Sequence, residues 1–213
     1  MKHKLIPRLS DDDWKEFCSR FHFSSDALPT IRAIYTALLP LVEANAFYSL
    51  DEDLAEVDFP HYAYGFVTLG TGVDELSELY LNHEQLEEAY IVDCLSLMLL
   101  SNAYEEFSHA IEEQSGLHPV ELSFLGDTYS LDLLPQIYTR LAPEGILLTD
   151  GQMLLPLKTA ALILHLDKQK STDVHSLCNT CASCKNFCCP SRKKSLLQDL
   201  PRTYGAMQIF RVK

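Results

Sequence analysis

Cysteines near the carboxyl end of the chain have the spacing that most directly predicts chemistry. Five of the seven cysteines follow the pattern C-x2-C-x2-C-x3-C-C, at Cys178, Cys181, Cys184, Cys188 and Cys189. Thiolates two residues apart can converge on one metal, and soft sulfur selects zinc, cuprous copper or iron–sulfur clusters. The pattern is close to a bacterial ferredoxin run, and it also suits a four-thiolate zinc site that would shape a short tail. Structural zinc, an iron–sulfur cluster and no metal remain the three alternatives.

Motifs of conventional catalysis are missing from the chain. It contains no G-x-S-x-G nucleophile elbow, no H-E-x-x-H zinc motif and no P-loop. The eight histidines are scattered, and His165 lies within an apolar run, which favours a satisfied core residue over a ligand. The sequence therefore gives little support for conventional catalysis and leaves enzymatic activity undecided.

Composition and charge narrow the class of protein. The 213 residues are 47% hydrophobic, which is typical of a globular chain with a sizeable core. The net charge of −13 is uneven: residues 171–213 carry seven basic and two acidic side chains, or +5, so residues 1–170 carry −18. An acidic body disfavours nucleic-acid binding. No apolar run is long enough to span a bilayer, so we expect a cytoplasmic protein without membrane partners.

Hydrophobic periodicity predicts the elements of the first half of the chain. We expect N-terminal helices across residues 10–47, with Ser10 as the first cap, and a strand at 61–70. A long helix over residues 84–114 follows, and Gly116 is expected to end it. Its apolar middle predicts a central helix that is buried by the rest of the fold.

The second half of the chain contains shorter elements. The pattern predicts a helix at residues 131–141, followed by a buried strand at 146–149 and a hairpin turn at 150–151. A returning strand at 152–155 and a last apolar segment at 160–166 complete this half. We therefore expect one α+β module over residues 1–170, with its core at 61–166. Residues 171–213 are expected to form a separate Cys-rich basic tail.

The second half also resembles a known family. The order L-S-x-x-G-D, then a helix, then L-T-D-G-Q-M-L-L-P-L-K-T looks like the activation domain of cobalamin (vitamin B12)-dependent methionine synthase in its short free-standing form. Its pattern L-T-x-S-x-M-M-x-P-x-K-S is matched at Leu148, Thr149, Met153, Pro156 and Lys158. The cysteine run is similar to a motif that closes many of those short proteins. The resemblance covers residues 66–192 and implies a central twisted, mainly antiparallel sheet flanked by helices.

The resemblance also implies a function. Such a module binds S-adenosylmethionine and presents it to an inactivated corrinoid, held by methionine synthase or another cobalamin-binding protein, for reductive remethylation. It places the ligand beside Glu121, Ser123, Gly126, Asp127, Pro156 and Lys158. This chain departs from the family at R-x-S-P-G-Y, because Glu121 replaces the arginine and the Pro-Gly-Tyr is absent. A carboxylate there should repel the carboxylate of S-adenosylmethionine.

Two other functions remain open at the level of sequence. A metal-carrying redox accessory would use the cluster from Cys178 to Cys189, and an iron–sulfur centre would supply the electron that cobalamin reactivation needs. An interaction scaffold would keep the fold without a ligand, and its basic tail would dock on an acidic partner.

Overall fold

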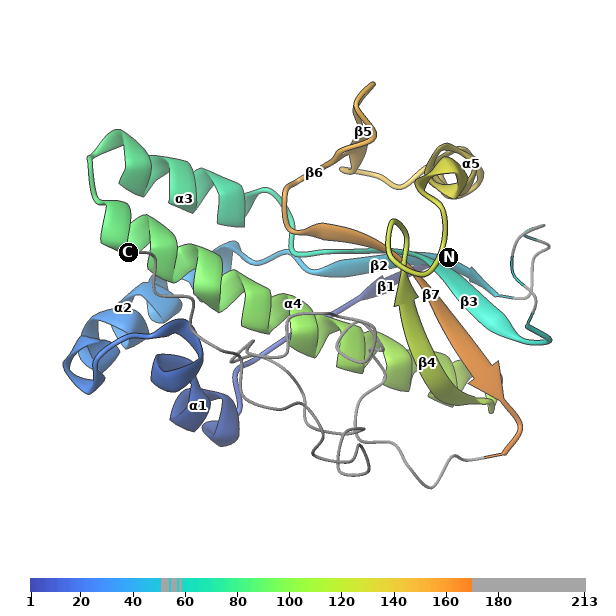
Figure 1. The fold of residues 1–213 in the computed structure, drawn as a ribbon, viewed down its shortest axis with the longest axis horizontal. Helices are drawn as coiled ribbons and strands as arrows, with labels where there is room; N and C mark the ends of the chain where they lie inside the picture. Colours follow the sequence, from blue (N-terminus) through green and yellow to red (C-terminus); the bar gives the residue numbers. More distant parts are fainter. Residues whose placement is uncertain (51–53, 55–56, 58, 170–213) are drawn as a thin grey trace, which may run out of the picture.

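The computed structural model describes residues 1–50, 54, 57 and 59–169 (Figure 1). A five-stranded antiparallel sheet forms the centre, in the order β1-β2-β3-β7-β4. Its strands are β1 (Lys2–Lys4), β2 (Asn45–Leu50), β3 (Tyr62–Thr68), β7 (Thr159–Asp167) and β4 (His118–Phe124). The order in the sheet departs from the order in the chain at β7, the last strand of the described residues, which lies between β3 and β4.

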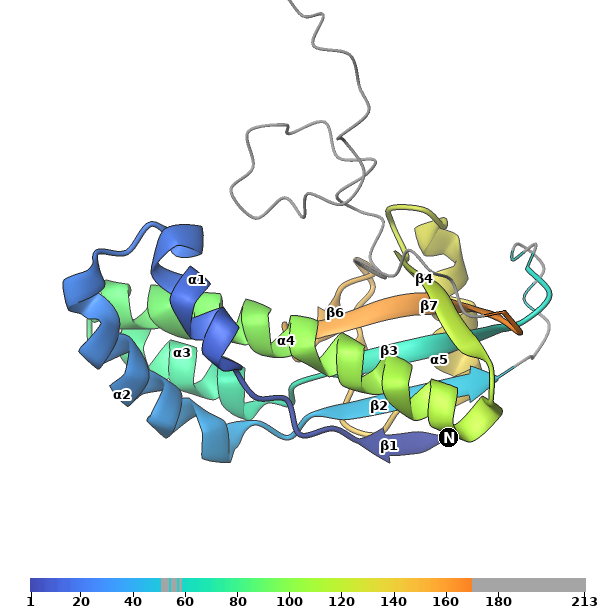
Figure 2. The same ribbon diagram turned by 90° about the horizontal axis from the view of Figure 1, so that it is seen from below.

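Helices cover both faces of the sheet (Figures 1 and 2). The carboxyl-terminal half of the long α4 (Leu86–Ser115) packs on one face. The helices α1 (Asp11–Phe21), α2 (Leu28–Leu38) and α3 (Gly72–Asn82) lie around its amino-terminal half, beside the sheet. The other face carries α5 (Leu134–Leu141) and the two-stranded hairpin of β5 (Leu147–Leu148) and β6 (Leu154–Leu155). Short 3-10 turns η1, η2 and η3 adjoin the helices at Ser25–Ala27, Leu39–Leu41 and Leu131–Leu133.

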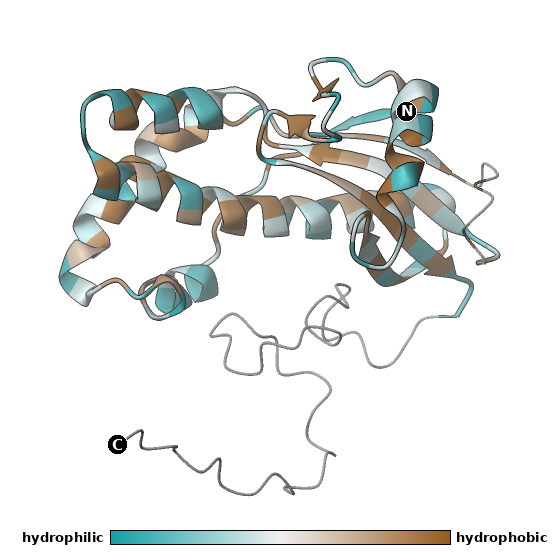
Figure 3. Ribbon diagram, turned by 45° about the horizontal axis from the view of Figure 1, so that its top comes forward, coloured by the Kyte–Doolittle hydropathy of each residue, from teal (hydrophilic) through white to brown (hydrophobic). Residues whose placement is uncertain are grey.

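The sheet separates two hydrophobic cores. Alternate residues of β7 point to opposite faces: Leu162 and Leu164 join the core beneath α4, whereas Ala161 and Ile163 join the core beneath α5. A strand that is buried on both faces has a continuous apolar sequence, as residues 160–166 do. Figure 3 shows the hydrophobic colouring running along the strands and the middle of α4.

Several local predictions are confirmed. Ser10 caps α1 through a capping box with Asp13, and Gly116 ends α4 in the left-handed conformation at φ 71°. Ser130 accepts a hydrogen bond from the Asp132 amide at the start of the η3–α5 segment. The α+β fold with its mainly antiparallel sheet is therefore as expected. Within the described residues, no helix combines the length and apolar character needed to cross a bilayer.

Two predictions about the elements were wrong, and one strand was not predicted. The helices expected over residues 10–47 end at Leu41, and residues 45–50 form β2, because their apolar side chains alternate between the two cores. The edge strand Lys2–Lys4 was not anticipated, since its side chains are all exposed and carry no hydrophobic pattern. The strand expected at 146–149 is only two residues long, and Leu147 is 62% exposed. The tail 171–213 lies outside the described residues.

Candidate functional site

Glu121 and Ser123 come together at one end of the sheet. In the β4–β7 register Glu121 pairs with His165 and Ser123 with Ile163, so all four residues share the face that α5 covers. The Ser123 hydroxyl is buried and donates a hydrogen bond to Glu121 Oε1 at 3.1 Å. The sheet thus holds a carboxylate in a fixed position beside an imidazole.

His165 is the buried polar group at the centre of this arrangement. His165 lies on the interior strand β7 and is 6% exposed. Its ring stacks on Phe59, with centroids 4.6 Å apart. Nε2 lies 2.8 Å from the Tyr129 hydroxyl. Nδ1 is buried without a hydrogen-bond partner among the described residues, and it lies 3.8 Å from Glu121 Oε2. Burial lowers the pKa of His165, and the nearby Glu121 charge opposes that shift.

Glu121 is the charged member of the pair. Its side chain is 30% exposed, so it reaches solvent from the edge strand β4. Within the described part of the chain it has no lysine or arginine partner, and only the neutral imidazole faces it. Glu121 is therefore a partly buried carboxylate that accepts a hydrogen bond from Ser123 and whose charge no cation of the described residues neutralises.

The turn after β4 positions Tyr129. Gly126 has φ 89°, a conformation that strains any residue with a side chain, and its amide donates to the Tyr129 carbonyl at 2.7 Å. This bond closes the turn and directs the Tyr129 ring back over β7, where it meets His165 edge-on at 5.8 Å. Asp127 is exposed on the same turn. The predicted residues Gly126 and Asp127 therefore adjoin the Glu121–Ser123 pair.

Pro156 and Lys158 lie at the opposite end of β7. Pro156 is buried, and Lys158 forms an ion pair with Asp93 of α4, with side chains 16% and 50% exposed. The adjoining Leu157 amide donates to Asp74 Oδ2 at 2.7 Å. These bonds fasten the start of β7 to α3 and α4, so the Lys158 cation already has an internal partner.

The six predicted ligand residues therefore divide into two groups. His165 lies opposite Glu121 and follows Lys158 by seven residues along one strand, a separation of roughly 23 Å in extended backbone. The sequence pointed to both groups but not to Tyr129 or Phe59, because their contacts depend on strand register and on a turn. His165 is in the core as predicted, but the prediction that its hydrogen bonds are satisfied was wrong for Nδ1.

Two of the seven cysteines lie in the described part of the chain, and the other five lie outside it. Cys178, Cys181, Cys184, Cys188 and Cys189 lie outside the described residues, so the metal prediction stays a prediction. Elsewhere, the structure gathers no three His, Cys, Asp or Glu side chains closely enough for a metal ion in the part it describes. Cys94 is buried in the core, and burial raises the pKa of its thiol to about 11.

The fold and this site define an α+β module with a polar cluster at one end of its sheet. No protein-family model matches the chain, and no curated protein matches it. Among solved structures, the chain is similar to the MetH reactivation domain bound to AdoHcy (S-adenosylhomocysteine), with a TM-score of 0.54 and 11% sequence identity. The match covers 80% of this chain and 79% of that one. The likeness shows that the two proteins share a fold.

Proposed function

We propose that this chain is a methionine synthase activation-domain-like module that binds an adenosyl ligand such as S-adenosylmethionine. The observation that carries the proposal is the shared fold, over four fifths of the chain, with a reactivation domain bound to AdoHcy. The sequence pattern from Leu148 to Lys158 supports the same assignment independently. The chain would act by binding and presenting its ligand, which fits the lack of conventional catalytic motifs.

The proposed ligand surface centres on β4 and the turn that follows it. Gly126 is exposed and has no side chain, so a ligand could approach the backbone of this turn closely. Glu121 supplies a negative charge and accepts a hydrogen bond from Ser123. Pro156 and Lys158 lie roughly 23 Å away at the far end of β7, where Lys158 pairs with Asp93 of α4 on the other face of the sheet, so they are not part of this surface.

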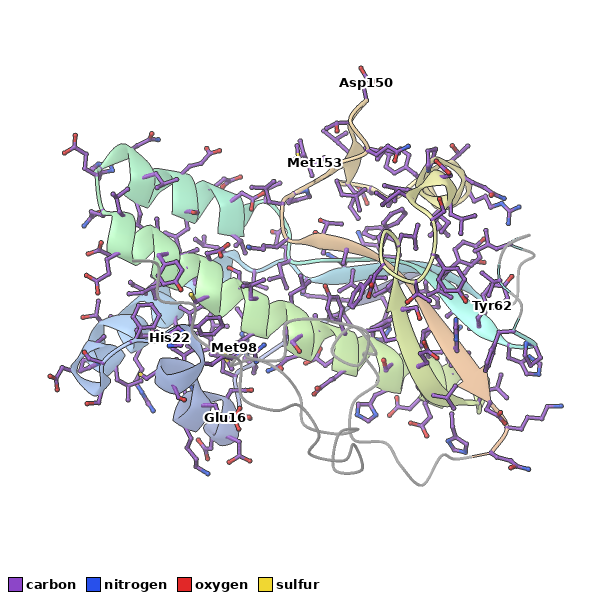
Figure 4. The ribbon with its side chains drawn as sticks, in the orientation of Figure 1. Glu16, His22, Tyr62, Met98, Asp150 and Met153 are labelled. Atoms are coloured by element: carbon purple, nitrogen blue, oxygen red, sulfur yellow. The ribbon has the colours of Figure 1, made fainter. Side chains whose placement is uncertain are left out.

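The proposed partner is a protein that carries a corrinoid. Support comes from the β5–β6 hairpin, which projects from the sheet with Asp150 at its tip and Met153 on its returning arm (Figure 4). Leu147, Met153 and Leu157 are 62%, 53% and 61% exposed around this hairpin. Exposed apolar side chains gathered on one projection are typical of a surface that another protein covers.

A binding titration tests the ligand proposal. Calorimetry on the full chain should detect S-adenosylmethionine or S-adenosylhomocysteine, and Gly126→Ala should weaken binding because a side chain there strains the turn and meets Leu131 at 3.2 Å. Gly145→Ala is the matched control, since Gly145 also has positive φ, at 78°, but lies in another loop with open space where a methyl group would be added. Failure of the wild type to bind either compound at millimolar concentration contradicts the proposal.

A second candidate function depends on the cysteine spacing. We propose as the alternative that Cys178–Cys189 carries an iron–sulfur or zinc centre, which would make the chain a redox accessory or give it a structured tail. Protein purified without oxygen should then contain stoichiometric metal, and Cys181→Ser should lose it. Iron with acid-labile sulfide would favour electron delivery, whereas a colourless protein with stoichiometric zinc would contradict the redox role.

A further inference from the structure

A gap between Glu121 Oε2 and His165 Nδ1 leaves a buried polar atom of the described core without a hydrogen bond. The two atoms are 3.8 Å apart, which is too long for a hydrogen bond. Nδ1 is nevertheless buried and has no other partner among the described residues. A buried polar atom left in this way costs free energy, so a group that donates to it would be bound favourably.

The surroundings of the gap determine what kind of group can enter. Glu121 contributes a negative charge without a lysine or arginine partner in the described part of the chain. The rings of Phe59 and Tyr129 pack against the imidazole at 4.6 and 5.8 Å between centroids. Carboxylates attract cations, whereas a second carboxylate would be repelled. The cluster is therefore suited to a cation and unsuited to an anion.

The hydrogen-bond geometry specifies the cation more closely. The Tyr129 contact is compatible with either tautomer of His165, and the one with the proton on Nε2 leaves Nδ1 as an acceptor that faces the carboxylate acceptor of Glu121. One nitrogen placed about 2.9 Å from each acceptor spans their 3.8 Å separation, because that separation is less than twice the bond length. The nitrogen must carry at least two hydrogens, as an ammonium group does. Nδ1 is itself closed to solvent, so the nitrogen reaches it only when the Glu121 side chain, which is 30% exposed, moves aside.

We propose that Glu121 and His165 bind the ammonium group of an organic cation, and that the chain selects ligands that carry an amine without a carboxylate. For an adenosyl ligand this inference rests on the proposed function and specifies it: the amine end lies at Glu121. Tyr62 of β3, which pairs with His165 of β7, marks this end of the sheet in Figure 4.

A pair of ligands that differ only in the carboxylate tests the inference. Decarboxylated S-adenosylmethionine should bind about tenfold more tightly than S-adenosylmethionine, which corresponds to about 1.4 kcal/mol. Glu121→Gln should abolish the preference, and Glu121→Asp, which keeps the charge on a shorter side chain, should reduce it. Glu112→Gln should retain the preference in full. It is a matched control because Glu112 also faces a histidine, but its Oε1 lies 2.7 Å from His118 Nδ1.

The same experiment separates failure of the inference from failure of the proposed function. Equal or tighter binding of S-adenosylmethionine to the wild type overturns the inference and leaves the proposed function standing. If neither adenosyl compound binds, the proposed function fails, and the inference is decided with phenethylammonium. That probe should shift the His165 imidazole signals in nitrogen-15 spectra of the wild type but not of Glu121→Gln, and no such Glu121-dependent shift overturns it.

Discussion

The two ends of β7 make a direct comparison. At its start, Lys158 pairs with Asp93 across the strand–helix contact, and both charges find an opposite charge inside the molecule. At its end, Glu121 of β4 faces His165 of β7. Glu121 Oε2 and His165 Nδ1 are too far apart for a hydrogen bond, and the neutral imidazole does not neutralise the carboxylate. One strand therefore carries one satisfied and one unsatisfied polar pair.

The difference shows how to separate two kinds of charged residue. The family resemblance points to both Glu121 and Lys158 as ligand residues. Lys158 forms an ion pair with Asp93 that links β7 to α4, so the charge of Lys158 is already neutralised within the molecule. Glu121 has no such internal use, so its charge is available to an external group. Stability measurements on variants of the two ends should reveal this difference, and the largest effect is expected for the strand that they share.

Truncating a core side chain in the middle of β7 should have the largest effect on the free energy of unfolding. Ile163 is fully buried in the middle of β7, so Ile163→Ala leaves a cavity and should lower the free energy of unfolding by about 2–5 kcal/mol. Urea denaturation gives the value. Leu147→Ala on the exposed hairpin is the control and should change stability by less than about 0.5 kcal/mol. Equal losses in the two variants would show that the β7 core does not support the fold as described.

Breaking the satisfied pair should have an intermediate and asymmetric effect. Asp93→Ala leaves the Lys158 ammonium, 16% exposed, without a partner and should cost about 1–3 kcal/mol of unfolding free energy. Lys158→Met leaves only Asp93, which is 50% exposed and can be hydrated, and should cost less than about 1 kcal/mol. Urea denaturation of both variants tests the asymmetry. A larger loss for Lys158→Met would mean that packing of the lysine stem outweighs its charge.

The His165 end should respond to pH instead. Burial lowers the folded-state pKa of His165, so below the ordinary histidine pKa the unfolded chain takes up a proton first. Its contribution to stability is therefore complete above that pKa and is lost as the pH falls toward the folded value. The charged or titratable groups that face the imidazole are Glu121 from β4, Tyr62 from β3 and Tyr129 from the turn.

Urea denaturation between pH 7.5 and pH 5 measures this loss. His165→Gln keeps an amide next to Tyr129 but cannot titrate, so its stability should fall less than that of the wild type over the same range. The remaining histidines are common to both proteins and cancel in the difference. Parallel pH profiles would mean that His165 is protonated as readily in the folded chain as in the unfolded one.

The sequence predicts most of the fold because local patterns determine it. The Ser10 cap, the Gly116 terminator and the long apolar repeat of α4 are each visible within a few residues. It does not predict β1, whose exposed lysines form a strand only because β2 lies beside them. It also does not separate β2 from the preceding helices, because a short apolar run buried on both faces has neither a helical nor an alternating pattern.

The candidate site is predictable only in part for the same reason. Glu121, Ser123 and Gly126 belong to one sequence motif, and the structure places them together. His165 joins them through the register of β4 on β7, including an irregularity between Pro119 and Glu121. Register shifted by one residue would turn His165 toward α4 instead, and no local pattern fixes that choice.

Neutralising the unsatisfied charge should have the smallest effect on stability. Glu121→Gln keeps an oxygen that accepts from Ser123 and removes a charge that has no cationic partner among the described residues. We expect unfolding free energy at pH 7 to change by less than about 0.5 kcal/mol, with either sign, because no ion pair is lost. Asp93→Ala, measured beside it in urea, should lose more. A loss of about 2 kcal/mol or more for Glu121→Gln would mean that the carboxylate stabilises the fold as Asp93 does. The ends of β7 would then be alike, and the reason to assign Glu121 to a ligand would be gone.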